Sequence, residues 1–435
     1  MASTPTRQMA LTLFMLPFGY HAGVWQHPDS RPWEVGQLSL IKEMAQAAER
    51  AKLHACFFAD SLDVSSLKFG SQRASGRYDP IVAMSALIGF TDKIGLIGTA
   101  STTFNEPYNL ARHYAEIDIL SGGRAGWNIV TSVAGGENFG MADMPEAEDR
   151  YERATEFVDV VRKLWLSWDA DAIIVDRERG LWVEPDRLHQ IDHVGKYYSV
   201  RGPFSFPRTP QGHPVLVQAG QSPAGMRLGS AVGDVIYTGQ PDHAKAIEFY
   251  ATYKDMVKAG GRDPEGVKII PGIMPIVAET EAEALEIAED YGSYVDPING
   301  RKQVEWFLDV DTTGIDYDEP IPAERLGDPE QSKTPWGRTL GRIAPGRTIR
   351  ELAVESSRAG GHQWMAGSAS QIADRMIEWF DSRACDGFNL NCPQVPVGMN
   401  RVLDLLVPEL QERGYFQTEY RGDTLRERMG LNPVG

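Results

Sequence analysis

Polar side chains recur where apolar, strand-like segments end, and these residues are the first candidates for chemistry. They are Asp60, Thr99, Ser101, Asn128, Ser132, Gln218, Asn389 and Asn391. Only Asp60 is an acid, so the set suits a polar, uncharged, planar ligand better than a metal ion or a pair of carboxylates that exchange a proton. The alternative is that each is a core polar residue that hydrogen-bonds to neighbouring backbone.

Asn128 lies in the segment SGGRAGWNIVTS, which runs from Ser121 to Ser132 and continues from a glycine turn into a strand-like stretch. Side chains alternate across a strand, so Asn128 and Ser132 share one face and Trp127 takes the other. A buried amide without a partner costs about 1–3 kcal/mol. Asn128 therefore either pairs with nearby backbone or contacts a ligand.

Ser222 opens a helix directly after a buried strand, in the segment AGQSPAG at residues 219–225. A serine followed by proline is an ordinary helix start. The position also suits a phosphate, because the first N–H groups of a helix and its dipole attract anions. The spacing G-x-S-x-x-G is not the G-x-S-x-G of a nucleophile elbow, so the motif does not indicate a serine hydrolase.

His21 is the best candidate for an active-site histidine, because it follows the first strand in a long loop rich in Gly, Pro and aromatic residues. His189 and His193 are four residues apart, but no glutamate completes an H-E-x-x-H motif, so we expect no metal site. Tyr151, at the start of a helix, is placed either to reach a phosphate or to pack. His113, on a helix, is expected to be structural.

Strand-like and helix-like segments alternate along the chain in about eight units, the number that closes a parallel barrel. Strands are expected at 10–16, 54–60, 94–103, 124–131, 214–218, 234–237, 267–277 and 387–391, and helices at 36–52, 80–91, 108–120, 149–168, 222–232, 243–259, 281–291, 368–382 and 402–413. An open doubly wound sheet usually carries G-x-G-x-x-G after its first strand, and none follows here. We therefore predict an α/β fold of the (β/α)8 TIM-barrel type, whose ligands bind at the C-terminal ends of the strands.

The predicted barrel forms one domain over residues 1–435. Polar, irregular insertions are expected at about 169–210 and 295–346. Residues 414–435 are expected to form a polar, partly helical tail without a core pattern, free to wrap a partner subunit.

The formal net charge of -17 argues against nucleic acid and anionic membranes as partners. Cys56, Cys385 and Cys392 are scattered without C-x-x-C or metal-ligand spacing, which is typical of reduced thiols. The apolar run that begins at Met9 is too short to span a bilayer and has no small-residue cleavage site. We therefore expect a cytoplasmic protein.

Together with FFADS, TASTTFNEPYNLARHYAEID, VRGPFSFPRTPQGHPVLVQAGQSPAG and RGYFQTEYRG, the segment SGGRAGWNIVTS resembles the nitrilotriacetate monooxygenase component A family. This branch of the bacterial-luciferase-like flavin monooxygenases includes dibenzothiophene sulfone, EDTA and long-chain alkane monooxygenases. The resemblance implies a TIM barrel with insertions that takes FMNH2 from a separate NAD(P)H:flavin reductase. It also implies that O2 adds to the flavin as a C4a-peroxide, which oxygenates a small organic substrate, heterocyclic or xenobiotic.

The resemblance places FMN contacts at Asp60, Thr99, Asn128, Ser132, Tyr151 and Ser222, and Ser101 joins them as a neighbour of Thr99 on the same strand face. Tyr151 and Ser222 would hold the phosphate, and the others would border the ring or the ribityl chain. The catalytic candidates are His21, Asn128 and Ser132. Two histidines common in the family appear here as Ala147 and Thr312, which leaves the substrate open.

A reactive flavin–oxygen species needs a site that excludes water more than it needs strong acids. Candidates for an apolar wall are Phe14, Trp25, Phe57 and Trp127, and the two insertions are candidates for a lid. The resemblance also implies a homodimer or homotetramer. The alternatives are a deazaflavin-dependent oxidoreductase, which transfers hydride without oxygen uptake, and a flavin-binding protein without oxygenase activity.

Overall fold

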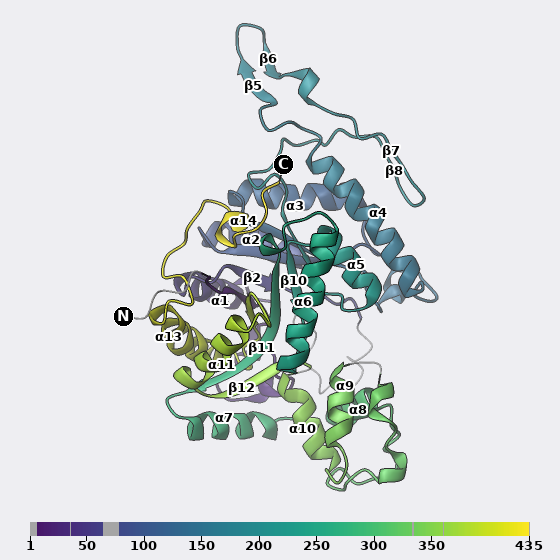
Figure 1. Cartoon of the computed structure of the whole chain (residues 1–435), viewed down its shortest axis with the longest axis vertical. Coiled ribbons are helices and arrows are strands. Elements are labelled where there is room, and N and C mark those ends of the chain that lie inside the picture. Colours follow the sequence, from purple (N-terminus) through teal and green to yellow (C-terminus); the bar gives the residue numbers. More distant parts are fainter. Residues whose placement is uncertain (1–6, 35, 64–77, 333–334, 360, 435) are drawn as a thin grey trace.

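The computed structural model describes residues 7–34, 36–63, 78–332, 335–359 and 361–434, and its centre is a closed barrel of eight parallel strands (Figure 1). In order around the barrel the strands are β1 (Ala10–Phe14), β2 (Ala55–Phe58), β3 (Gly95–Ser101), β4 (Ala125–Val130), β9 (Val215–Gln218), β10 (Val235–Thr238), β11 (Lys268–Ala278) and β13 (Gly387–Leu390). β13 pairs with β1 and closes the ring. The predicted TIM barrel is confirmed, and the open doubly wound sheet is excluded.

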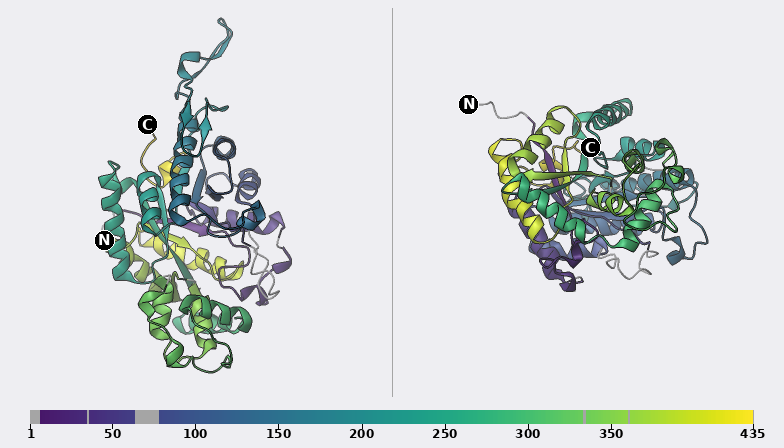
Figure 2. Two further views of the ribbon diagram at one scale, coloured as in Figure 1. Left: turned by 90° about the vertical axis from the view of Figure 1, so that its right-hand side faces the viewer. Right: turned by 90° about the horizontal axis from the view of Figure 1, so that it is seen from below.

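Helices follow the strands and cover the outside of the barrel (Figures 1 and 2). They are α1 (Leu38–Arg50), α2 (Pro80–Leu87), α3 (Pro107–Ser121), α4 (Ala147–Trp165), α5 (Pro223–Val232), α6 (His243–Ala259), α7 (Glu281–Ser293), α11 (Ala369–Asp381), α12 (Val397–Arg401) and α13 (Val407–Glu412). A π-helical turn, Val402–Leu406, joins α12 to α13. Short 3₁₀ helices lie at Val24–Gln26, Pro32–Glu34, Ile88–Phe90, Gly136–Phe139, Pro185–Arg187, Pro264–Gly266, Ala323–Arg325 and Pro329–Gln331.

The strands and helices follow from local sequence signals. Barrel strands are buried on both faces, which explains their continuous apolar runs. Several helices begin at an Asp, Ser or Thr whose side chain accepts a backbone N–H of the first turn. These N-cap residues are Asp79, Ser222, Asp242, Thr280, Asp296 and Ser368.

Alternation along β4 sends Trp127 outward and Asn128 into the barrel. The Trp127 ring lies 6.0 Å from that of Tyr114 on α3 and 5.9 Å from that of Phe157 on α4, measured between centroids. Its Nε1 donates to Ala100 O at 3.1 Å. Trp127 is therefore part of the core between barrel and helices, and it is not part of an apolar wall inside the barrel.

The first insertion consists of two antiparallel hairpins, β5 (Ile173–Asp176) with β6 (Leu181–Val183) and β7 (His193–Val194) with β8 (Ser199–Val200). It follows the C-terminal end of α4, and helices of a βα barrel run back toward the N-terminal ends of the strands. The β5–β6 hairpin accordingly projects away from the body in Figures 1 and 2. This placement is against a lid role for β5–β6.

The second insertion is helical, so the expectation of an irregular segment is wrong. It contains α8 (Pro297–Leu308) and α9 (Pro335–Ile343), and α10 (Ile349–Ala359) and β12 (Gln363–Ser368) follow; β12 pairs with the C-terminal half of β11. The helices share a small core of their own that includes Val304, Leu340 and Leu352. Within it, Thr312 is fully buried and donates to Glu305 Oε1 at 2.6 Å.

The tail closes the N-terminal end of the barrel instead of lacking a core pattern. Leu425 in α14 (Leu425–Arg428), Met429 and Leu431 belong to the same apolar cluster as Ala10 and Val215 in the barrel interior. Arg426, which is buried, lies 2.8 Å from the carboxylate of Asp234 at the start of β10. Residues 414–434 thus pack on their own chain, which corrects the expectation that they are free to wrap a partner.

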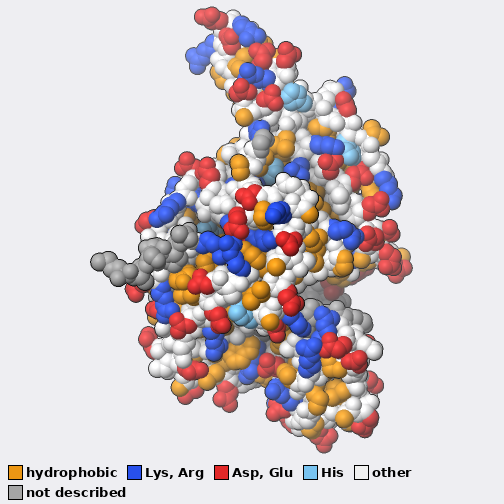
Figure 3. All heavy atoms as spheres, viewed as in Figure 1, with side chains coloured by type: hydrophobic (Ala, Val, Ile, Leu, Met, Phe, Trp, Pro, Cys, Tyr) orange, Lys and Arg blue, Asp and Glu red, His pale blue; other side chains and the backbone are white. Residues whose placement is uncertain are grey.

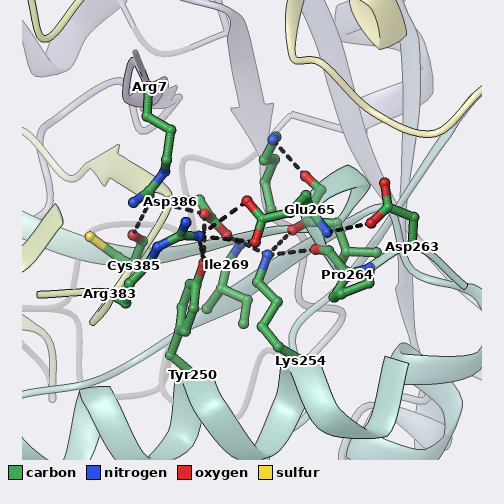
Figure 4. A network of polar contacts seen from close by, with 12 residues as sticks. Arg7, Tyr250, Lys254, Asp263, Pro264, Glu265, Ile269, Arg383, Cys385 and Asp386 are labelled. Atoms are coloured by element: carbon green, nitrogen blue, oxygen red, sulfur yellow. Dashed lines mark hydrogen bonds and ion pairs between the residues drawn. The ribbon is translucent and has the colours of Figure 1, made fainter. Parts of the chain in front are cut away.

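A network of charged side chains ties strand ends to α6 at the N-terminal end of the barrel (Figure 4). The carboxylate of Asp386, directly before β13, forms ion pairs with Arg7 at 3.2 Å and with Lys254 at 2.9 Å. It also accepts the Tyr250 hydroxyl at 2.9 Å and the Ile269 N–H at 3.0 Å. A charged network of this kind at the N-terminal face of a barrel serves stability, because ligands bind at the other face.

Acidic and basic side chains are interspersed over the face of the molecule shown in Figure 3. Within the described ranges, no helix combines the length and the apolar character needed to cross a membrane.

Candidate active site

β3 and β4 bring the predicted polar residues of their C-terminal ends into contact. The parallel register sets Thr99 opposite Asn128, and Asn128 Nδ2 donates to Thr99 Oγ1 at 2.8 Å. Further along the strands, Ser132 Oγ donates to Ser101 Oγ at 2.8 Å. Thr99, Ser101 and Asn128 are buried. The predicted common face of these residues is confirmed.

Asn128 Oδ1 is buried and finds no hydrogen-bond partner among the described residues. An acceptor left in this state costs about 1–3 kcal/mol. Proteins keep such atoms where a ligand, an ion or an ordered water completes the hydrogen bond. Asn128 therefore fits a ligand that presents an N–H or O–H group inside the barrel.

A cleft of about 260 Å³ opens beside these pairs at the mouth of the barrel. Its lining includes Asp60, Thr99, Ser101 and Ser132 together with apolar groups such as Phe104. Asp60, which follows β2, accepts the Ser61 N–H at 2.8 Å. The cleft thus joins two carboxylates, those of Asp60 and Asp79, to a row of hydroxyl groups, as expected for a polar ligand held by hydrogen bonds.

Ser132 has a positive φ of 41°. Residues other than glycine rarely adopt this left-handed conformation, and holding one there costs of order 1–3 kcal/mol. Such strain gathers at ligand sites. Here it turns the Ser132 side chain back toward Ser101 after β4 has ended.

A second group of residues lies at the N-terminus of α5, the helix that follows β9, and β9 is the strand next to β4 in the barrel. Ser222 Oγ accepts the Gly225 N–H at 3.1 Å, so Ser222 is an N-cap as the sequence predicts. Gly220 and Gly225 leave room for Tyr151, since a Cβ on either would lie 2.6 or 2.9 Å from the Tyr151 hydroxyl. Tyr151 thus faces a helix N-terminus, where an anion is favoured.

His21 is buried at a different place from these two groups. Its Nδ1 accepts the Gly23 N–H at 3.3 Å, and its ring packs 6.2 Å from Tyr291 of α7. The His21 N–H also donates to Pro393 O at 3.2 Å, so these contacts place His21 between the loop after β1, the segment after β13 and α7.

The sequence analysis missed a histidine that does face the barrel interior. His362 lies between α10 and β12, with its ring 5.6 Å from Tyr20 and 5.6 Å from Tyr237. Burial lowers the pKa of His362 to about 4, so its imidazole is neutral at pH 7. The only local signal was the Gly360–Gly361 turn before it, which gave no reason to expect a site.

Other predicted positions take structural roles. Gln218 pairs in register with Ile129, so it points to the outside of the barrel and not to its mouth. His189 and His193 bind different carboxylates, Asp169 at 2.9 Å and Glu156 at 3.1 Å. His113 is exposed on α3.

A parallel barrel with hydrogen-bonding strand ends and a helix N-terminus at one mouth is the arrangement in which βα barrels bind phosphate-bearing ligands. The Luciferase-like monooxygenase family model matches residues 15–384, and the chain belongs to this family. It is a flavin-dependent monooxygenase of the kind that acts on small organic molecules.

The chain is similar over almost its whole length to characterised members. It is 41% identical to N-acetyl-S-(2-succino)cysteine monooxygenase of Bacillus subtilis, covering 98% of this chain and 97% of the relative. It is 39% identical to nitrilotriacetate monooxygenase component A of Aminobacter aminovorans, again covering 98% and 97%. A solved structure of riboflavin lyase with modified FMN superimposes with a TM-score of 0.84 at 29% identity, over 98% of this chain and 97% of the other.

Proposed function

We propose that the chain binds reduced FMN, supplied by a separate NAD(P)H:flavin reductase, and uses O2 to oxygenate a small organic substrate. The observation that carries the proposal is the buried Asn128 Oδ1, an acceptor that lacks a partner in the described protein and lies at the ligand-binding end of the barrel. The isoalloxazine ring of reduced flavin offers N–H donors. The name component A, given to the relative from Aminobacter aminovorans, supports a partner that supplies the flavin.

Two groups of residues would hold the cofactor. Tyr151 and Ser222 would bind the phosphate. Ser222 caps the N-terminus of α5, and the hydroxyl of Tyr151, which belongs to α4, reaches the same helix end. The residues at the ends of β2, β3 and β4 would border the ring and the ribityl chain: Asp60, Thr99, Ser101, Asn128 and Ser132. Reduced flavin supplies the two electrons of the reaction, in which one atom of O2 enters the substrate and the other leaves as water.

The protein's own part is to position the reactants and to exclude water. Phe14, Phe57 and Tyr237 form an aromatic wall inside the barrel, with ring centroids 5.8 Å apart for the first pair and 5.2 Å for the second. Asn128 and Ser132, which border the proposed ring site, are the proposed catalytic contacts. His21 remains a proposed third member, to be tested by comparing His21→Gln with His362→Gln in product formation.

The remaining proposals concern substrate, assembly and compartment. The aromatic wall supports a heterocyclic or other xenobiotic substrate, because it offers flat apolar surface beside polar groups. We further propose a homodimer or homotetramer that works in the cytoplasm. Size-exclusion chromatography with light scattering tests the assembly.

Oxygen uptake tests the oxygenase proposal. The purified chain is mixed with FMN, a flavin reductase and NADH under air, and product is followed beside O2 consumption with dibenzothiophene sulfone as one test substrate. We expect the protein to slow the free oxidation of reduced FMN. Reduced FMN that oxidises as it does without the protein would reject the oxygenase, and hydride transfer without oxygen uptake would indicate a deazaflavin enzyme instead.

A matched pair of serine variants tests the phosphate site. Ser222 and Ser368 are both N-caps whose Oγ accepts a backbone N–H, in α5 and α11 respectively. Ser222→Ala should weaken FMN binding by about tenfold, the loss of one hydrogen bond to a charged group, while Ser368→Ala should leave FMN binding unchanged. Tyr151→Phe should act like Ser222→Ala, and unchanged affinity in both would reject this phosphate site.

A further inference from the structure

A second polar group lies across the barrel from Thr99 and Asn128. It consists of Tyr237 on β10, Asn391 just beyond β13, and His362 before β12. β10, which carries Tyr237, is two strands from β4 in the ring, and β13, which Asn391 follows, is four strands from β4, so the second group extends to the side of the barrel opposite Asn128. The proposed flavin contacts use only the first group.

The Tyr237 hydroxyl is surrounded by polar atoms, and its hydrogen bonds to Asn391 and His362 are long. It lies 3.4 Å from Asn391 Oδ1 and 3.5 Å from His362 Nε2. Asn391 Nδ2 is also 3.4 Å away. Hydroxyl hydrogen bonds are normally 2.7–2.8 Å long, and such contacts tighten when a ligand binds. The hydroxyl therefore retains most of its capacity to donate to a ligand.

Gly272 on β11 allows this group to form. A Cβ at that position would lie 2.7 Å from each of Asn391 Nδ2, His362 Nδ1 and the Tyr237 hydroxyl. Glycine in a strand interior weakens the strand, so it is retained where other groups must approach the backbone closely.

Both titratable groups are uncharged at neutral pH. Burial raises the pKa of Tyr237 well above its ordinary value, so the phenol keeps its proton. A neutral imidazole of His362 that carries its proton on Nε2 donates to the Tyr237 oxygen, which leaves the phenol O–H free as a donor and the group without charge. An uncharged donor favours a neutral acceptor such as a carbonyl or sulfonyl oxygen over an anion.

The aromatic wall continues into this group. Tyr20 packs against both Phe14 and His362, with centroids 5.4 and 5.6 Å away, and Tyr237 packs against Phe57. A molecule that lies flat on these rings would bring an oxygen at its edge to Tyr237 and His362. Aromatic rings favour flat partners that offset-stack on them.

We propose that Tyr237, with His362 and Asn391, forms the substrate-recognition contact of the site and selects a flat, neutral molecule that carries a carbonyl or sulfonyl oxygen. The proposal rests on the proposed function and names the substrate class for it. Tyr237 would donate to the substrate oxygen, and His362, with its proton on Nε2, would be a positioning residue that orients the phenol by donating to the phenol oxygen.

The test compares two ligands of the same shape, dibenzothiophene sulfone and fluorene, of which only the sulfone carries acceptor oxygens. Binding of each to the full-length protein is measured by tryptophan fluorescence. We expect the sulfone to bind the native protein at least tenfold more tightly than fluorene. Tyr237→Phe, which removes only the hydroxyl, should abolish this preference and leave fluorene binding and FMN affinity unchanged.

His362 is tested by two variants so that loss of folding is not mistaken for loss of recognition. His362→Phe should reduce the sulfone preference as Tyr237→Phe does, and His362→Gln, which retains an N–H donor, should restore part of it. The proposal is overturned if the native protein shows no preference, if neither ligand binds, or if the preference survives in Tyr237→Phe. Failure of FMN to bind the native protein would overturn the proposed function separately, because the ligand comparison needs no flavin.

Discussion

Asn128 and Asn389 are buried amides inside the same barrel, but they differ in how they are satisfied. Asn389 Oδ1 accepts the Thr12 hydroxyl at 2.6 Å, whereas Asn128 Oδ1 has no partner in the described residues. Removing Asn389 leaves the Thr12 hydroxyl unpaired, while removing Asn128 relieves the desolvation penalty of Oδ1, which offsets the lost hydrogen bond to Thr99 Oγ1. The two residues therefore separate a structural role from a ligand-binding role.

The first prediction follows from that difference. Asn128→Ala should weaken reduced-FMN binding by about tenfold and change the free energy of unfolding by less than about 1 kcal/mol. Asn389→Ala should instead destabilise the fold by about 2 kcal/mol through the unpaired Thr12 hydroxyl. Anaerobic flavin titration and urea denaturation measure the two effects. Equal destabilisation by both variants would show that Asn128 has a structural role and not a ligand-binding role.

Residue-level prediction from sequence worked where strand parity was clear. Thr99, Ser101, Asn128 and Ser132 could be put on one face because they lie on regular strands with buried apolar neighbours. Gln218 was placed wrongly at the mouth, since a shift of one residue moves a side chain to the other face of a strand. His362 could not be found, because only long-range packing brings it to the barrel.

At the scale of elements, Glu49 on α1 holds the segment that leads into β3 through hydrogen bonds. Its Oε1 accepts the N–H groups of Asp92, Lys93 and Ile94 at 2.9, 2.6 and 2.9 Å. One carboxylate thus satisfies three successive amides that would otherwise lack partners. Because Thr99 and Ser101 lie on β3, this contact also supports the proposed flavin site.

We therefore expect Glu49→Ala to lower the free energy of unfolding by about 2–3 kcal/mol, the worth of hydrogen bonds to a charged acceptor. Glu116→Ala is the control, because Glu116 makes only a surface pair with Arg112 on α3 and should cost less than about 1 kcal/mol. Chemical denaturation of both variants provides the comparison. Similar losses for the two would show that the Glu49 contact does not hold β3.

Element prediction succeeded for the barrel and failed in the second insertion. The barrel helices have wide apolar stripes, as in α4 with Phe157, Val160 and Leu164. In α8 only Gly300 and Val304 are buried, so the helical period was too weak to recognise among polar residues. The start signal Asp296–Pro297 was present, and Asp296 does cap α8.

At the scale of the whole molecule, the C-terminal tail is part of the barrel's closure. The tail was misjudged because its apolar residues Leu425, Met429 and Leu431 are spaced among charged ones and show no long period. Arg426 and Asp234 form a buried ion pair whose side chains are each 6% exposed. Breaking such a pair from one side leaves a buried charge.

Arg426→Met should accordingly lower the free energy of unfolding by about 3–5 kcal/mol. Arg350→Met removes an exposed pair with Asp318 and should cost less than about 1 kcal/mol. Thermal and urea denaturation report both values. If Arg426→Met is as mild as Arg350→Met, the tail does not contribute to stability through this pair.

The fold also has a predicted pH dependence. Burial lowers the pKa of His54 and of His213 to about 4, below the ordinary value of 6.5. Between pH 6.5 and 4 the unfolded chain therefore binds protons that the native chain does not, so stability falls as the pH is lowered through this range. At about 1.4 kcal/mol per pKa unit, each histidine contributes roughly 3 kcal/mol over the full range.

Denaturation at pH 7.5 and pH 5 measures this effect. His54→Gln keeps an acceptor for the Leu11 N–H, which His54 Nδ1 accepts at 3.2 Å, and should flatten the dependence. Stability that is constant from pH 7.5 to pH 5 would contradict the assignment of His54 and His213 as neutral buried groups.

The central claim is that reduced FMN binds across the ends of β3, β4 and β9. A crystal structure of the protein prepared with FMN and dithionite without oxygen tests it most directly. The account predicts the phosphate at the N-terminus of α5, within hydrogen-bond distance of Tyr151 and Ser222, and a flavin N–H on Asn128 Oδ1. A flavin bound elsewhere, or with Asn128 Oδ1 still unpaired, would contradict it.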